Sequence, residues 1–271
     1  MKLKCLTCEA LARPVYLSAA YSPHVVDVEL FAIGLHNTPD DLRARLQAQI
    51  DAASGQGYDA LVLAYGLCGK STHGLTAREI PVVIPRAHDC ITLFLGDRTR
   101  YKDQFENYPG TYWYVMDYIQ RNDSAGTTLS LGAETAGDIS AVYDEYVAKY
   151  GQDNADYLME VMGAWQAHYK RAVYIDMGVG NGAAVEAQTE AEAARRGWTF
   201  ERMAGDLVLI KRLLDGDWDD DFLVLEPGQQ IAMSYDEGVI HGQHHTPNLH
   251  PQSRNRAADE HPPLLDRARG R

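Results

Sequence analysis

The sequence predicts an α/β fold made of two Rossmann-like units, with mainly parallel sheets and a cleft between them. Three observations support this prediction. Short β-rich apolar runs alternate with longer segments of helical periodicity. One run, residues 59–66, is almost continuously apolar before a glycine, which is typical of a strand buried on both faces of a parallel sheet. The alternation then resumes after residue 172, which indicates a second unit.

The first half of the chain opens with predicted strands at residues 3–7 and 25–33, separated by a helix at 9–21. A further helix begins at Thr38-Pro39, because threonine can cap the free amides and proline suits the first helical position. This helix is followed by the buried run described above and by two more predicted strands, at 80–85 and 112–118.

The second half has a mainly helical segment at residues 141–169. It is followed by predicted strands at 172–176, 198–202 and 222–225, with helices at 183–196 and 206–215 between them. We divide the chain into an N-terminal α/β unit (1–125), a helical segment plus second α/β unit (126–235) and a disordered tail rich in His, Pro and Arg (236–271). A single large sheet with an inserted helical segment is the alternative.

Composition and charge restrict the function classes. Asp and Glu outnumber Lys and Arg by 38 to 25, so the formal net charge is −13. Because an acidic body repels phosphate backbones and anionic lipid, we expect neither nucleic acid nor a membrane as a partner. No stretch approaches the roughly 18 apolar residues that a membrane helix needs, and no signal region follows the first methionine. We therefore expect a cytoplasmic protein.

Three of the four cysteines follow predicted strands. Cys8, Cys68 and Cys90 come after the strands at 3–7, 59–66 and 80–85. The carboxyl ends of parallel strands share one edge of a sheet, and neighbouring strands lie about 4.8 Å apart, so the three thiols can converge. Three thiolates with one open position suit catalytic zinc or an iron–sulfur cluster with one unprotected iron. Cys5, inside the first strand, is expected to be a core residue; the alternative is a dithiol with Cys8, in which the strand ends early and both sulfurs face the pocket.

Groups near these cysteines are candidates for catalysis. Cys8 precedes a helix whose N-terminus favours a thiolate, so we expect its pKa to lie below the usual value of roughly 8.5. Arg86 and His88, just before Cys90, are expected to orient a small anionic substrate or cofactor together with Lys70. The segment around Lys70 ends like a phosphate-binding P-loop, but it has two residues between its glycines where that loop needs four.

A second glycine motif follows the strand at 172–176. Its residues are Asp176, Gly178, Gly180 and Gly182. This pattern resembles the first motif of S-adenosylmethionine-dependent methyltransferases, in which glycines let the backbone approach the ligand and an acid about twenty residues on, here Glu201, binds a ribose hydroxyl. The alternative is a glycine-rich turn lining the cleft between the two units.

The chain resembles domain-of-unknown-function family 1638 across residues 2–228. The segments that carry the resemblance include Arg-x-His-Asp-Cys and lie at 64–69, 85–96, 169–176 and 213–218. This resemblance implies an association with corrinoid proteins and methyltransferases of one-carbon metabolism, and it assigns no reaction.

Three functional hypotheses follow. The first is a metal–thiolate enzyme or accessory protein of one-carbon methyl transfer, possibly corrinoid-linked, with zinc or an iron–sulfur cluster on Cys8, Cys68 and Cys90. The second is an S-adenosylmethionine-dependent methyltransferase that uses the glycine motif at 176–182. The third is a non-enzymatic, metal-stabilised partner of a corrinoid protein.

Overall fold

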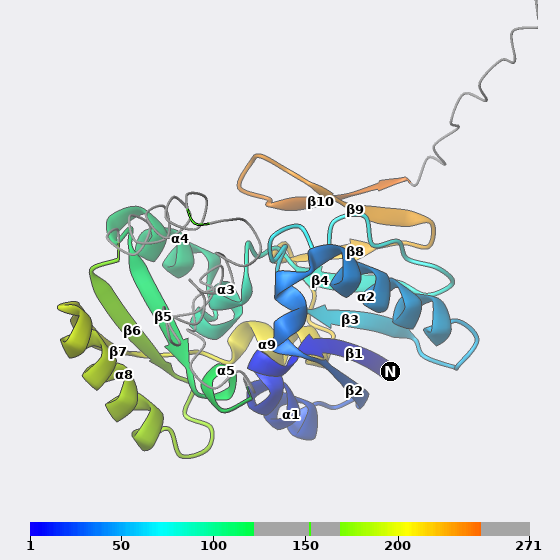
Figure 1. Cartoon of the computed structure of the whole chain (residues 1–271). Coiled ribbons are helices and arrows are strands. Elements are labelled where there is room, and N and C mark those ends of the chain that lie inside the picture. Colours follow the sequence, from blue (N-terminus) through cyan, green and yellow to red (C-terminus); the bar gives the residue numbers. More distant parts are fainter. Residues whose placement is uncertain (122–151, 153–168, 245–271) are drawn as a thin grey trace, which may run out of the picture.

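The computed structural model of the chain describes residues 1–121, 152 and 169–244. The predicted helix at 141–169 and the end of the predicted tail fall almost wholly outside these described residues. The described part is an α/β protein with two main sheets and a small hairpin (Figure 1). None of the described helices is both long and apolar enough to cross a bilayer.

The larger sheet has five strands in the order β2-β1-β3-β4-β8 (Figure 1). Four of them are parallel, and β8 joins the edge next to β4 in the antiparallel direction. The strands are β1 (Lys2–Cys8), β2 (Val25–Phe31), β3 (Ala60–Ala64), β4 (Val82–Pro85) and β8 (Phe222–Leu225). All five residues of β3 are buried, as expected for a central strand covered on both faces.

Helices connect and cover these strands. A one-turn 3-10 helix, η1 (Glu9–Leu11), leads into α1 (Ala12–Tyr21), and a second, η2 (Ile33–Asn37), leads into α2 (Pro39–Ala53). Proline begins α2 as predicted, and Leu42, Leu46 and Ile50 form its buried face. Thr38 does not cap the helix with its side chain; its hydroxyl donates to the carbonyl of Leu35 instead.

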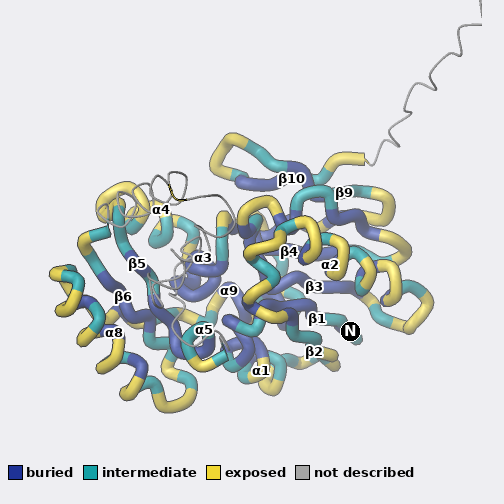
Figure 2. The backbone as a smooth tube through the Cα atoms, in the orientation of Figure 1, coloured by how far each residue is buried: buried dark blue, intermediate teal, exposed yellow. Residues whose placement is uncertain are grey.

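The smaller sheet has three parallel strands in the order β5-β6-β7. They are β5 (Thr111–Val115), β6 (Arg171–Asp176) and β7 (Thr199–Ala204), and the helices around them are α3 (Cys90–Leu95), α4 (Arg98–Asn107), α5 (Met116–Arg121) and α8 (Ala183–Arg196). Val115, Val173 and Ile175 belong to the same hydrophobic core as the larger sheet, so the two sheets pack through one interior. Figure 2 shows this continuous buried interior and the exposed outer surfaces of α2 and α8.

The strand at 222–225 forms where it was predicted, but in a different sheet. We had expected it to extend the second unit, whereas β8 pairs with β4 in the larger sheet, Val83 opposite Val224. The reason is α9 (Val208–Asp215), whose buried face packs against α1 and against β3 and β4 and so returns the chain to the first unit. The three-stranded sheet is therefore inserted within the chain of the five-stranded one.

Part of the predicted disordered tail is ordered. Residues 229–244 form a hairpin of β9 (Gln229–Met233) and β10 (Ile240–His244). Ile231 and Ile240 are fully buried in the main core, which anchors the hairpin despite its polar sequence. The prediction of disorder is wrong for residues 240–244, and residues 245–271 lie outside the described part.

Candidate functional site

Cys8, Cys68 and Cys90 lie at one edge of the larger sheet. Cys8 is the last residue of β1, Cys68 lies in the loop after β3, and Cys90 is the first residue of α3, just after β4. Since β1, β3 and β4 are neighbours, their carboxyl ends bring the three cysteines to the same region, as the sequence predicted. We call these three residues the thiol cluster.

The loop that carries Cys68 has an uncommon backbone conformation. Cys68, Gly69 and Lys70 all have positive φ angles, of 45°, 62° and 74°. Such conformations cost energy in residues other than glycine and persist where the surroundings impose them. The Cys68 amide donates to the His88 carbonyl at 2.9 Å, and the Ser71 hydroxyl donates to the Cys68 carbonyl at 2.7 Å. These bonds fix the Cys68 loop beside the segment that leads to Cys90.

Gly66 allows the two loops to lie this close. A Cβ atom at Gly66 would lie 2.7 Å from the backbone N and Cα of Asp89 and 2.9 Å from the carbonyl oxygen of Ala87. These are backbone atoms of the loop before Cys90, so they cannot move aside as a flexible side chain would. Only glycine therefore fits at this position. Its function is to allow the close approach of the two loops, although the sequence around it resembles a phosphate-binding loop.

All three thiols are buried. The exposed fractions of Cys8, Cys68 and Cys90 are 2%, 7% and 3%. Burial raises the pKa of Cys8 to about 12, and it raises the pKa values of Cys68 and Cys90 well above the usual range. Charge on the other cysteines of the cluster adds to the rise at Cys68 and Cys90. With no cation among them, the three thiols are therefore protonated and neutral at pH 7.

The expected low pKa of Cys8 is wrong. The amide of Ala10 does donate to Cys8 Sγ at 3.5 Å and lowers the pKa, as a helix N-terminus should. However, the helix that begins there is a single 3-10 turn of three residues, and desolvation of the buried sulfur outweighs it. A cation or ligand is needed before Cys8 becomes a thiolate at neutral pH.

His36 is a site residue that the sequence analysis missed. Its Nε2 lies 3.3 Å from Cys8 Sγ. It belongs to η2, which follows β2, the neighbour of β1 in the sheet. Burial lowers the pKa of His36, so the ring is neutral at pH 7, the form that ligates metals. Its position just after a predicted strand was the available signal, but its relevance depends on the strand order.

Tyr65 brings a hydroxyl to the same region. It directly follows β3, its side chain is 1% exposed, and its hydroxyl has no hydrogen-bond partner among the described residues. Burial raises its pKa well above the usual value, and charge on Cys8 and Cys68 raises it further. A buried hydroxyl that no described residue uses as a donor therefore lies beside the thiol cluster.

Asp89 and His88 differ in what they contribute. Asp89 caps α3, accepting from the amide of Ile91 at 2.9 Å, and also accepts from the Tyr101 hydroxyl at 2.9 Å. His88 is exposed and stacks on the ring of Tyr101, with ring centroids 6.0 Å apart. Asp89 therefore positions the start of the helix that carries Cys90, while His88 lies at the surface beside it.

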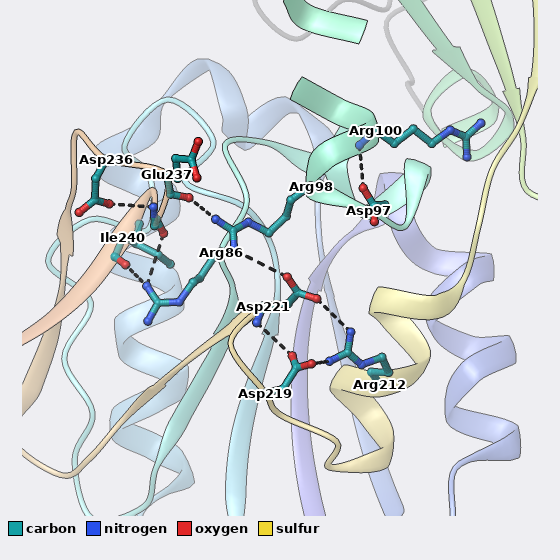
Figure 3. A network of polar contacts seen from close by, with 11 residues as sticks. Arg86, Asp97, Arg98, Arg100, Arg212, Asp219, Asp221, Asp236, Glu237 and Ile240 are labelled. Carbon is teal, nitrogen blue, oxygen red and sulfur yellow. Dashed lines mark hydrogen bonds and ion pairs between the residues drawn. The ribbon is translucent and has the colours of Figure 1, made fainter. Parts of the chain in front are cut away.

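Arg86 and Lys70, both expected to hold an anion, have other contacts. The Arg86 guanidinium donates to the carbonyl oxygens of Ile240 and Gly238 in the hairpin (Figure 3). Lys70 is exposed, and its carbonyl accepts from Arg43 at 2.7 Å. Arg86 thus attaches the hairpin to the strand that leads toward Cys90, and Lys70 remains at the surface of the Cys68 loop.

The glycine motif at 176–182 lies at the end of β6, in the other sheet. The Asp176 carboxylate accepts from the Gly178 amide at 3.0 Å and forms an ion pair with Arg202. Gly178 and Gly180 have positive φ angles of 65° and 80°. Gly182 precedes α8, and a Cβ atom there would overlap the hydroxyl of Tyr174. The glycines therefore form a tight turn packed against neighbouring side chains.

The geometry does not bring Glu201 to this glycine motif. Glu201 pairs with Val173 in the β6–β7 register, three residues before Asp176, or about 10 Å along the strand. Its carboxylate forms an ion pair with Arg171 at 2.6 Å. The pocket beside the motif, lined by Arg13, Met116 and Val179 among others, has a volume of about 10 Å³, room for about one water molecule.

The thiol cluster brings three strand ends together without forming a ready metal site among the described residues. All four cysteines are free. Within the part of the chain that the structure describes, no three His, Cys, Asp or Glu side chains stand in a ready metal-binding arrangement. Cys8 Sγ accepts from a backbone amide, and backbone hydrogen bonds at Gly66 and Cys90 lower the pKa of Cys68. Binding an ion would replace these bonds after rotation about the cysteine χ1 angles.

The comparisons with known proteins assign the chain to a family without assigning an activity. No curated protein and no solved structure matches it. One family model matches residues 30–214, more than half of the chain. The matched segment contains Cys68, Cys90 and His36 and begins after Cys8. The chain belongs to the family described as "Protein of unknown function (DUF1638)".

Proposed function

We propose that this protein is a metal–thiolate enzyme of one-carbon methyl transfer. Cys8, Cys68 and Cys90 bind a zinc ion, and the open fourth position takes a small substrate with an anionic sulfur or oxygen atom. The observation that carries the proposal is the thiol cluster itself: three free, buried cysteines at the ends of three neighbouring parallel strands. The free thiols also fit a protein of the reducing cytoplasm.

The electrostatics of the cluster support a cation at this place. Three buried thiols whose charges would raise one another's pKa values cannot ionise together unaided. A divalent ion would lower the pKa values of the three thiols, because its positive charge stabilises the thiolates, and the thiol protons would be released on binding. His36, 3.3 Å from Cys8 Sγ, would then orient that thiolate by a hydrogen bond.

The same site suits methyl transfer to sulfur. Zinc held by Cys8, Cys68 and Cys90 would supply Lewis-acid chemistry, lowering the pKa of a coordinated substrate thiol so that it could act as a nucleophile at neutral pH. The substrate thiolate would then attack the methyl carbon of a methylcorrinoid carried by a partner protein. A carbon–sulfur bond would form and the carbon–cobalt bond would break, with its electron pair left on cobalt, so that Co(III) would become Co(I). The chain's own residues supply burial, which excludes water, and the fixed positions of the three ligands.

The first experiment measures metal content. The protein is purified without oxygen, and metals are quantified by mass spectrometry in the wild type and in Cys8→Ala, Cys68→Ala and Cys90→Ala. We expect about one zinc per chain in the wild type and a loss of most of it in each variant. Cys5→Ala is the matched control, because Cys5 is fully buried within β1, between Val28 and Val62, away from the strand ends.

Two results would contradict the proposed site. Full metal content in the Cys68 variant would show that the thiol cluster does not bind the metal. Equal metal loss in Cys5→Ala would show that the losses come from general destabilisation. Broad absorption near 400 nm together with bound iron would show that the three ligands hold an iron–sulfur cluster instead of zinc.

A second experiment tests the reaction. Zinc-loaded protein is mixed with methylcobalamin and a small thiol, and the absorption of the methylated cofactor is followed without oxygen. We expect its loss together with formation of Co(I) and of the thioether, and no such change with the Cys68 variant. Zinc binding without any methyl transfer would favour the non-enzymatic role as a metal-stabilised partner of a corrinoid protein.

A further inference from the structure

Tyr65 is placed to reach whatever the thiol cluster binds. Thr7 pairs with Ala64 in the parallel register of β1 and β3. Cys8 and Tyr65 are the next residues along these two chains, so both lie at the same carboxyl edge of the sheet, where neighbouring strands are about 4.8 Å apart. The ring also lies near His36, with centroids 6.2 Å apart.

The hydroxyl of Tyr65 has an unmet hydrogen-bonding need. It is buried, and it has no partner among the described residues. A buried hydroxyl without a partner costs about 1–3 kcal/mol, so native proteins rarely keep one unless a water or ligand completes it. Tyr114, in the other sheet, is a second buried tyrosine with an unpartnered hydroxyl, and it packs in a cluster of tyrosines and Met116 that contains no cysteine.

We propose that the Tyr65 hydroxyl donates a hydrogen bond to the ligand atom that occupies the open position of the thiol cluster. This inference rests on the proposed function. It restricts the ligand class: the bound atom must accept a hydrogen bond while it faces the metal, as a thiolate, an alkoxide or a carboxylate oxygen does. Tyr65 is then a binding residue that selects for anionic sulfur or oxygen.

The protonation state of Tyr65 is suited to this role. Burial raises the pKa of Tyr65, so the phenol stays protonated at pH 7 and is a donor, not a competing anion. A hydrogen bond to a charged acceptor in a buried place is worth about 1.5–3 kcal/mol. The donor therefore adds measurable affinity for an anionic ligand and none for a ligand atom without a free lone pair.

The test compares Tyr65→Phe with Tyr114→Phe as the matched control. Both variants remove one buried, unpartnered hydroxyl, so in metal-free protein neither should lower the melting temperature. Both should keep the wild-type metal content. The discriminating measurement is calorimetric titration of the metal-loaded proteins with 2-mercaptoethanol. We expect the affinity of Tyr65→Phe to fall about tenfold, or about 1.4 kcal/mol, and that of Tyr114→Phe to stay unchanged.

The outcomes separate this inference from the function on which it rests. Equal thiol affinity in Tyr65→Phe and wild type, with full metal content in both, would overturn the role of Tyr65 and leave the metal site standing. An equal loss of affinity in both variants would also overturn it, because the effect would then not be local. Absence of bound metal in the wild type would overturn the proposed function and this inference together.

Discussion

The thiol cluster and the glycine motif at 176–182 occupy equivalent places in two sheets, but they are held together differently. Each lies where a parallel strand ends, and each has a glycine with no room for a Cβ atom, against backbone at Gly66 and against the Tyr174 hydroxyl at Gly182. Around the glycine motif the charged groups pair with one another: Arg202 contacts both Asp176 and Glu186. At the thiol cluster, backbone hydrogen bonds provide the framework, the cysteines form no disulfide, and the Tyr65 hydroxyl has no partner among the described residues.

The difference shows how a functional site is distinguished from a structural turn. Both segments resemble ligand-binding loops in sequence. In the structure, the acids of the glycine motif are neutralised by arginines and the adjoining pocket is about the size of one water molecule. Buried groups without partners, in contrast, are unstable unless a ligand completes them. The thiol cluster is therefore the stronger candidate for chemistry.

The largest effect is expected from Gly66→Ala. Its new methyl group would press on backbone atoms of Asp89 and Ala87, which cannot move without separating the loops of Cys68 and Cys90. We expect a loss of about 3 kcal/mol or more in the free energy of unfolding, together with lost metal binding. Chemical denaturation and metal analysis measure the two effects.

Gly178→Ala is the control for this prediction, because it makes the same change in the other region. Gly178 has a positive φ of 65°, but nothing lies within 4 Å of a Cβ atom there. Backbone strain alone should cost about 1 kcal/mol and leave metal content intact. If Gly66→Ala proved as mild as Gly178→Ala, the close approach of the two loops would not matter to the site.

An intermediate effect is expected from Arg86→Ala. The substitution removes the hydrogen bonds from the guanidinium to the carbonyls of Ile240 and Gly238. Hydrogen bonds from a charged donor contribute about 1.5–3 kcal/mol, and we expect a loss of stability in this range as the hairpin detaches. Metal content should be unchanged. A variant of full stability that binds metal poorly would contradict this structural role and would support the prediction from the sequence that Arg86 belongs to the functional site.

The smallest effect concerns acid sensitivity in the inserted unit. Burial raises the pKa of Glu192, but hydrogen bonds from Arg195 and Arg196 outweigh it, so that the net pKa lies below the usual 4.5. A lowered carboxyl pKa contributes stability above pH 4.5, and this contribution is lost as the pH falls through the lowered value. Because the pairs are partly exposed, it is less than about 1 kcal/mol.

Glu192→Gln tests this contribution by denaturation at several pH values. The variant should be slightly less stable than the wild type at pH 7, and the difference should shrink as the pH falls below 4.5 and through the lowered pKa. The difference should also shrink at high salt, which screens partly exposed pairs. A difference that grew toward acid pH would contradict the sign of the pKa shift.

Local patterns predicted much of the fold. The expected strands at 3–7, 25–33 and 59–66 correspond to β1, β2 and β3, because apolar runs bounded by helix starts and glycines depend mainly on local sequence. The positions of Cys8, Cys68 and Cys90 at strand ends followed from the same reasoning. The predicted helix at 141–169 lies outside the described residues and stays a prediction.

Features that depend on tertiary packing could not be predicted. The apolar residues of β8 suit any buried strand, and only the packing of α9 decides which sheet they join. The hairpin at 229–244 buries few side chains and has no apolar period, so its part from residue 236 onward was assigned to the tail. His36 is a single histidine whose importance appears only once β2 is known to lie beside β1.

The insertion of the smaller sheet has a mechanical consequence for the thiol cluster. The chain leaves the larger sheet after α3, at Gly96, and returns at Asp206, where the Asp206 amide donates to the Phe94 carbonyl at 2.9 Å. The two crossings therefore lie side by side, and α3 runs about 9 Å from them back to Cys90. On the other side, α5 packs against η1, the turn that directly follows Cys8, and Asp117 of α5 pairs with Arg13. The inserted sheet thus braces the thiol cluster at two of its three cysteines, so a change in its packing would reach Cys8 and Cys90 together.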